Sequence, residues 1–117
     1  MAPRTEKQPP GRILIADDEA AIANGLSAIL NDAGYEVEVA ADGQKALERL
    51  SSERFGVVLA DLKMPKLDGI ALLKAIRERS IPTEFVMITG QGTTELAIES
   101  MKEGAADYIE SRQRSDR

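Results

Sequence analysis

Short apolar runs alternate along this chain with segments of helical periodicity, and this alternation constrains the fold more than any other feature. The runs predict strands at residues 12–16 ("RILIA"), 35–40 ("YEVEVA"), 55–60 ("FGVVLA"), 84–89 ("EFVMIT") and 106–110 ("ADYIE"). Helices are expected between them, at about 19–33, 44–50, 70–79 and 93–103. Regular alternation of this kind predicts a doubly wound α/β fold with a five-stranded parallel sheet and helices on both faces.

The side-chain pattern also predicts how some elements pack. The first helical segment has one apolar face, expected to contact the core, with Ile22, Leu26, Ile29 and Ala33. The third run, 55–60, is apolar throughout, which is typical of a strand covered on both faces. Asp42 precedes the second helical segment and can cap it through its side chain.

Composition excludes several classes of function. A chain of 117 residues suggests one domain, and its net charge of -5 argues against direct nucleic-acid binding. Without cysteine or histidine it has neither disulfides nor a zinc site of the usual kind. No apolar run approaches a membrane span and the N-terminus lacks a signal-peptide core, so we expect a cytoplasmic protein.

Residues 1–11 ("MAPRTEKQPPG") are rich in proline and poor in large apolar side chains. This composition predicts a flexible N-terminal segment. The folded domain is therefore expected to occupy residues 12–110.

Polar side chains occur where three of the expected strands end. Asp17 and Asp18 follow the first strand, Asp61 follows the third, and Thr89 ends the fourth. In an open parallel sheet, sites form beyond the carboxyl ends of the strands, so these residues would converge if the first and third strands are neighbours.

Such a cluster has a chemical consequence. Three adjacent carboxylates stay ionised together only around a cation, and a site without His or Cys favours Mg²⁺. Asp61 would be the nucleophile of a phosphoryl transfer, Asp17 and Asp18 would hold the metal, and Thr89 would donate a hydrogen bond to the phosphate. Alternatively, each acid is only a helix cap or a solvated strand end.

The same residues resemble the receiver domain of two-component response regulators, over about residues 12–110. The motifs are "ADDE" (16–19), "DLKMPKLDG" (61–69) and "MITG" (87–90), and the segment 90–110 is most similar to receivers of enhancer-binding transcription activators. The resemblance implies a phosphoacceptor at Asp61 and a sensor histidine kinase or phosphotransfer protein as donor. It also implies that the Lys63 backbone carbonyl is a further metal ligand and that Tyr108 is the aromatic switch residue. Such a domain is not an enzyme beyond its own phosphorylation and dephosphorylation.

The resemblance breaks after residue 110. The family has Lys-Pro where this chain has Ser111-Arg112, and residues 111–117 ("SRQRSDR") lack the apolar residues of the family's last helix. The missing ammonium group suggests impaired phosphorylation. One hypothesis is a frameshifted or truncated end, and the other is a natural short receiver with an atypical tail.

Three alternatives in function remain to be weighed. A phosphorylation-independent interaction module, or pseudo-receiver, is favoured by the missing Lys and disfavoured by the intact acids. An Asp-based phosphohydrolase usually has a second acid two residues after the first, where this chain has Lys63. A dinucleotide-binding domain needs a Gly-rich first turn, whereas this chain has "ADDEAA".

Without the last helix, part of one sheet face is expected to be bare. Exposed apolar area of several hundred Å² costs roughly 25 cal/mol per Å², which is comparable to the whole stability of a small domain. We therefore expect a symmetric homodimer, formed by packing the bare faces together or by exchanging secondary-structure elements. The alternative is a monomer in which the tail or first helix shifts to cover the gap.

Overall fold

A computed structural model describes residues 11–89 and 94–110 of the chain. The elements are β1 (Arg12–Ala16), α2 (Ala20–Asp32), β2 (Glu36–Ala40), α3 (Gly43–Ser52), β3 (Val57–Asp61), α4 (Gly69–Glu78), β4 (Glu84–Thr89), α5 (Thr94–Lys102) and β5 (Asp107–Glu110). The segment expected to be flexible, residues 1–11, lies outside the described residues except for Gly11, and so does the atypical tail 111–117. The expected loss of a final helix therefore falls on residues that are not described.

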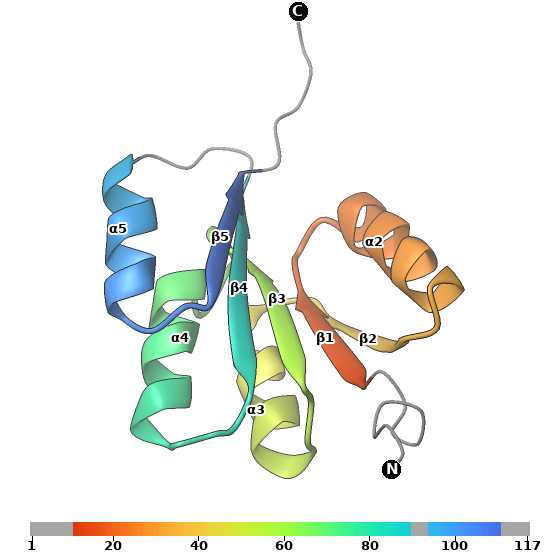
Figure 1. Ribbon diagram of the computed structural model, residues 1–117, viewed down its shortest axis with the longest axis horizontal. Coiled ribbons are helices and arrows are strands. Elements are labelled where there is room, and N and C mark those ends of the chain that lie inside the picture. Colours follow the sequence, from red (N-terminus) through yellow and green to blue (C-terminus); the bar gives the residue numbers. More distant parts are fainter. Residues whose placement is uncertain (1–10, 90–93, 111–117) are drawn as a thin grey trace, which may run out of the picture.

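All strands pair in parallel, and their order in the sheet is β2-β1-β3-β4-β5. Parallel neighbours need crossover connections, and the four helices supply them. Figure 1 shows α2 on one side of the sheet and α3, α4 and α5 on the other. The predicted doubly wound α/β class is confirmed, and β1 and β3 are neighbours as the convergence of the acids requires.

Each face of the sheet contributes to a separate apolar core. The larger core joins the sheet to α3 and α4, through buried residues that include Leu14, Val58, Leu72 and Phe85. The smaller core lies under α2, where Ile13, Ile15 and Ala23 are buried. The sheet face under α2 is thus covered by less apolar material than the other face.

The apolar face predicted for α2 is partly wrong. The helix packs on the sheet through Ala23, Leu26 and Leu30, whereas Ile22 is 38% exposed and Ile29 67% exposed. Almost every turn of this helix carries apolar side chains, so its sequence does not specify a single buried direction. The sheet beneath the helix selects that direction.

The double-sided burial predicted for the third strand is also only partly observed. Val58 and Ala60 are fully buried on the α3 and α4 side, but Val57 and Leu59 on the α2 side are only half-buried. The strand spans Val57–Asp61 and not the predicted residues 55–60, so that Asp61 is its last residue.

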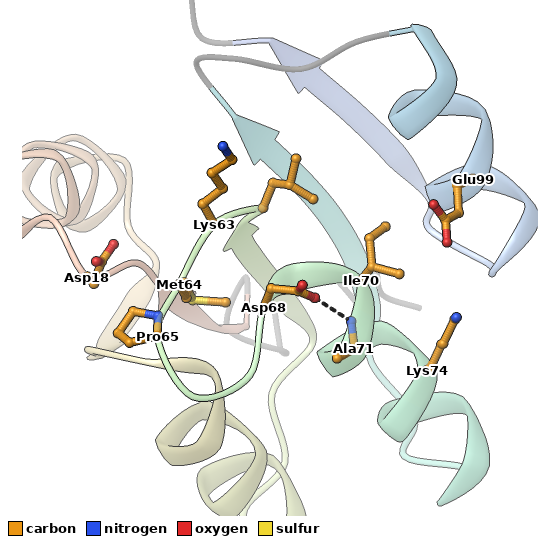
Figure 2. Close-up of a pocket in the computed structure, with 10 residues that line it drawn as sticks. Asp18, Lys63, Met64, Pro65, Asp68, Ile70, Ala71, Lys74 and Glu99 are labelled. Atoms are coloured by element: carbon orange, nitrogen blue, oxygen red, sulfur yellow. Dashed lines mark hydrogen bonds between the residues drawn. The ribbon is translucent and has the colours of Figure 1, made fainter.

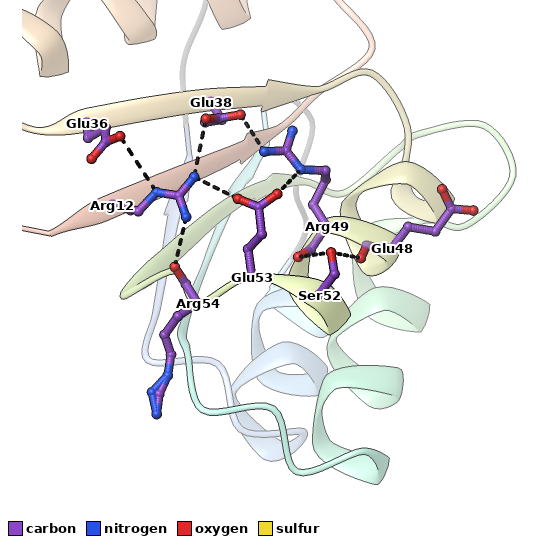
Figure 3. A network of polar contacts seen from close by, with 8 residues as sticks. All are labelled: Arg12, Glu36, Glu38, Glu48, Arg49, Ser52, Glu53 and Arg54. Carbon is purple, nitrogen blue, oxygen red and sulfur yellow. Dashed lines mark hydrogen bonds and ion pairs between the residues drawn. The ribbon is translucent and has the colours of Figure 1, made fainter.

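At the opposite end of the sheet from the acidic residues, charged side chains form a network (Figure 3). Glu53 pairs with Arg12 at 2.9 Å and with Arg49 at 3.0 Å, and Glu38 accepts from both arginines. The Arg12 guanidinium also lies 4.4 Å from the centre of the Phe55 ring. This network ties the start of β1 to β2 and to the end of α3.

None of the helices within residues 11–89 and 94–110 is long and apolar enough to cross a membrane.

Candidate functional site

The candidate site lies at the carboxyl edge of the sheet, where β1 and β3 end side by side. Ala16 is in register with Ala60, so Asp17 and Asp61 occupy neighbouring positions at the strand ends. The Asp17 N–H donates to the Ala40 carbonyl at 3.1 Å, which extends the β1–β2 ladder to the site. The topology therefore places these two carboxylates together without any contribution from a long loop.

Three carboxylates converge at this edge. Asp17, Asp18 and Asp61 each present an oxygen within 4.8 Å of the others. Asp17 is buried, Asp61 is half-buried and Asp18 is exposed, so the cluster is open on one side. The Glu19 N–H donates to Asp17 Oδ1 at 2.9 Å and fixes the orientation of that carboxylate.

The environment of the cluster disfavours negative charge. Burial, followed by the charges of Asp17 and Asp18, raises the pKa of Asp61 from 3.8 to about 6, although the N–H groups of Leu62 and Lys63 partly offset this. Burial also raises the pKa of Asp17, an effect opposed by the N–H of Glu19. The carboxylates are thus held together at an energetic cost that a cation would remove.

These residues fit a hard divalent cation. Carboxylate oxygens are the ligands that Mg²⁺ and Ca²⁺ prefer, and three of them lie close enough to share one ion. Open space beside Asp18 leaves room for water or phosphate oxygens, which Mg²⁺ retains as ligands in most protein sites.

The segment after Asp61 is anchored to the core. Leu62 and Met64 are buried in the larger core, and the Gly69 N–H donates to the Leu62 carbonyl at 2.9 Å. Asp68 caps α4 by accepting from the Ala71 N–H at 2.9 Å. The loop is therefore closed at its base and holds Asp61 in place.

Gly69 is a site residue whose role the sequence did not reveal. A Cβ at this position would lie 2.6 Å from the Asp61 carbonyl oxygen and 2.8 Å from the Met87 sulfur. Only glycine allows α4 to start this close to the end of β3. Its position within the "DLKMPKLDG" motif was the available signal, but the contact depends on the tertiary structure.

A pocket of about 750 Å³ opens beside the acidic cluster (Figure 2). Asp18 borders it at one end, the loop of residues 62–68 and the first turn of α4 form its floor, and Lys74 and Glu99 lie at the other end. The side chain of Lys63 lines this pocket and points away from Asp68. A phosphorylated group could therefore approach the cluster from solvent.

The remaining predicted site residues are placed by their backbone alone. Thr89 ends β4, one residue beyond Ile88, which is in register with Asp61. Tyr108 lies in β5 in register with Met87. Ser111 and Arg112, which stand where a Lys-Pro was expected, lie outside the described residues.

Comparisons with known proteins agree with this arrangement. The family model of the response regulator receiver domain matches residues 13–116. The transcriptional regulatory protein FixJ of Bradyrhizobium diazoefficiens is 40% identical over 107 residues, which cover 92% of this chain and 52% of FixJ. The transcriptional regulatory protein ZraR of Escherichia coli K12 is 37% identical over 97 residues, covering 83% of this chain and 22% of ZraR.

Solved structures extend the similarity to three dimensions. The CheX–CheY–BeF3–Mg²⁺ complex from Borrelia burgdorferi matches with a TM-score of 0.87 and 27% identity, over 95% of this chain and 85% of the other. The chain spans about half or less of the length of the curated relatives described above.

Proposed function

The chain belongs to the response regulator receiver domain family, and from this premise we propose that its residues 12–110 accept a phosphoryl group on Asp61. The donor is the phosphohistidine of a sensor histidine kinase or of a phosphotransfer protein. The convergence of Asp17, Asp18 and Asp61 within 4.8 Å, at the mouth of an open pocket, is the observation that carries this proposal.

Asp61 is the best-placed nucleophile of the three acids. It ends a central strand, its backbone is held by the anchored loop that follows, and its side chain is only half-buried. In the transfer, an Asp61 Oδ forms a bond to phosphorus while the phosphorus–nitrogen bond of the donor breaks. The histidine nitrogen keeps the electron pair, and the product is an acyl phosphate on Asp61.

Asp17, Asp18 and Asp61 are the residues that would hold Mg²⁺, with the Lys63 backbone carbonyl as a further ligand. When bound, the ion neutralises negative charge on the carboxylates and on the phosphoryl oxygens. The raised pKa values of Asp17 and Asp61 support this assignment, because burial and the neighbouring acids disfavour negative charge there, and a bound cation would offset that cost.

Thr89 and Tyr108 complete the proposed site. Thr89 would donate a hydrogen bond to the phosphoryl group, and Tyr108 would respond to phosphorylation as the switch aromatic. The position of Thr89 at the same edge of the sheet supports its role. Because Ser111-Arg112 replaces the family's Lys-Pro, we expect phosphorylation to be slow.

The wider function follows the family. The domain is not an enzyme in the usual sense and acts at most on its own Asp61. We place it in the cytoplasm, without direct contact to nucleic acid, which the net charge of -5 supports. Self-association as a homodimer is part of the proposal.

A pseudo-receiver that docks a partner without being phosphorylated is the second candidate. The replacement of the expected Lys by Ser111 favours it. This second candidate predicts the same fold and the same acidic cluster, but it predicts that no phosphodonor phosphorylates the protein covalently.

Incubation with Mg²⁺ and a small acyl-phosphate donor, followed by intact-mass measurement, separates the two candidates. The receiver proposal expects the mass of one phosphoryl group to appear on the wild type and not on Asp61→Asn. Asp68→Asn is the matched control, because this exposed acid belongs to the same loop and lies outside the cluster. If the phosphoryl mass persists on Asp61→Asn, Asp61 is not the phosphoacceptor. If the wild type gains no phosphoryl mass, the pseudo-receiver is favoured.

A further inference from the structure

The loop after Asp61 contains a backbone conformation that residues with a side chain rarely adopt. Lys66 has a φ of 71°, and the Leu67 N–H donates to the Pro65 carbonyl at 2.7 Å. Together they form a γ-turn centred on Lys66, and a γ-turn with positive φ at its centre is the rare, strained form. The Lys66 side chain is exposed, so its burial does not compensate for the strain. Other parts of the structure must therefore impose this turn.

The first residue of α3 lies directly against the end of this turn. A Cβ on Gly43 would lie 1.9 Å from the Leu67 carbonyl oxygen and 2.8 Å from the Leu67 carbonyl carbon, so only glycine leaves room for the loop there. Gly43 is itself buried, and Asp42 caps the helix by accepting from the Lys45 N–H at 2.8 Å. The tip of the loop thus lies on a rigid element that is distant in sequence.

The base of the loop is equally constrained. Gly69 allows α4 to start against the end of β3, and the buried Leu62 and Met64 fix the segment that follows Asp61. With base and tip both fixed by packing, the connection from Pro65 to Leu67 has to adopt the strained turn. The strain at Lys66 is therefore the consequence of two close approaches, one at Gly69 and one at Gly43.

The first residues of this loop face the Asp61 carboxylate. Burial raises the pKa of Asp61, but backbone hydrogen bonds from Leu62 and Lys63 lower it, so these two N–H groups are directed at the carboxylate. The Lys63 carbonyl, assigned above as a further Mg²⁺ ligand, belongs to the next peptide unit. A displacement of the loop would move the two donors and this carbonyl together.

We propose that Gly43 and Lys66 are positioning residues for the Asp61 site. Gly43 lets α3 support the loop tip, and the strained turn at Lys66 keeps Leu62 and Lys63 in place beside the carboxylate. Neither residue contacts the ion or the phosphoryl group, and both act through the loop. This role rests on the proposed function, because it concerns the same carboxylates and the same Mg²⁺.

Titration calorimetry with Mg²⁺ measures the effect of Gly43. Gly43→Ala is expected to weaken Mg²⁺ binding about tenfold or more, which is the usual loss when a group that orients a metal ligand is altered. The matched control is Gly56→Ala, at the opposite end of β3. A Cβ on Gly56 would meet only the Arg12 carbonyl oxygen, at 3.8 Å, so this variant should bind Mg²⁺ as the wild type does.

Two substitutions at the exposed position 66 test the turn itself. Lys66→Gly and Lys66→Val remove the same charge, so a difference in Mg²⁺ affinity between them reports the backbone alone. Glycine adopts a positive φ freely, whereas a β-branched residue strongly disfavours it. Lys66→Gly should bind Mg²⁺ at least as tightly as the wild type, and Lys66→Val about tenfold more weakly than Lys66→Gly. If Gly43→Ala fails to fold, this pair decides the outcome.

Amide NMR signals in EDTA provide a readout that needs no metal. Gly43→Ala should shift the amide signals of Leu62 and Lys63 and speed the hydrogen exchange of the Leu67 N–H. Gly56→Ala should leave all three unchanged.

The positioning role is overturned if a folded Gly43→Ala binds Mg²⁺ as tightly as Gly56→Ala. It is also overturned if the two variants of Lys66 bind Mg²⁺ equally, or if the signals of Leu62 and Lys63 do not move. A wild type that binds no Mg²⁺ would count against the proposed function, and the amide signals would then decide the positioning role by themselves.

Discussion

Replacing Asp61 by Asn should stabilise the metal-free protein at neutral pH. The Asp61 carboxyl has a pKa of about 6 in the folded state and 3.8 as the reference value of an unperturbed side chain. Between these values the folded protein holds a proton that the unfolded chain has released. Its free energy of unfolding therefore falls as pH rises through this window, and Asn removes the penalty.

The size of the effect follows from the pKa change. A difference of about two units corresponds to roughly 3 kcal/mol at pH values above both. Asp61 is only half-buried, and solvent screening reduces that figure. We expect Asp61→Asn to raise the free energy of unfolding by about 1–2 kcal/mol at neutral pH in EDTA.

Urea denaturation at several pH values, with EDTA or with Mg²⁺, measures this difference. The gain should shrink as the pH is lowered from about 6 to 3.8 and below, because Asp61 then becomes protonated in the unfolded state as well as in the folded state. Added Mg²⁺ should stabilise the wild type more than the variant, because the variant lacks one of three carboxylate ligands. Asp68→Asn should change stability by less than about 0.5 kcal/mol, since it lies outside the cluster and Asn also caps helices. A variant less stable than the wild type in EDTA at neutral pH would refute the reasoning.

Three further changes test other parts of the structure. Gly69→Ala should cost about 1–3 kcal/mol in urea denaturation, because the new Cβ meets the Asp61 carbonyl oxygen at 2.6 Å; full stability would contradict the close approach. Asp42→Ala should cost about 1 kcal/mol by thermal or urea unfolding, because Asp42 accepts from the Lys45 N–H at 2.8 Å and caps α3. Hydrogen bonds from Arg49 and Arg12 lower the pKa of Glu53, so its contribution is present at neutral pH and is lost as pH falls through the folded value. Glu53→Gln should therefore lower the melting temperature at neutral pH and low salt, and an equal loss in acid or at high salt would count against the ion pairs.

Much of the fold and the heart of the candidate site could be predicted from the sequence. The alternation of β-branched runs with helical segments determined a parallel α/β sheet, because both periodicities are local properties. The positions of Asp17, Asp18 and Asp61 at strand ends then predicted that they converge if the first and third strands are neighbours, since the carboxyl ends of parallel strands share one edge. The strand order itself came from the structure. The helix cap at Asp42 could also be predicted from the sequence, because capping depends only on neighbouring backbone groups.

Only the tertiary structure decided how α2 is turned and how tightly the loop after Asp61 is held. Ala23 is buried and Ile29 exposed, although isoleucine is the larger apolar residue, because the sheet beneath α2 selects a direction that the helix leaves open. Gly69 matters because α4 starts within 2.6 Å of the Asp61 carbonyl oxygen, a distance between residues on different elements. Local pattern fixes which element a residue joins, whereas burial and close approach depend on what the other elements place against it.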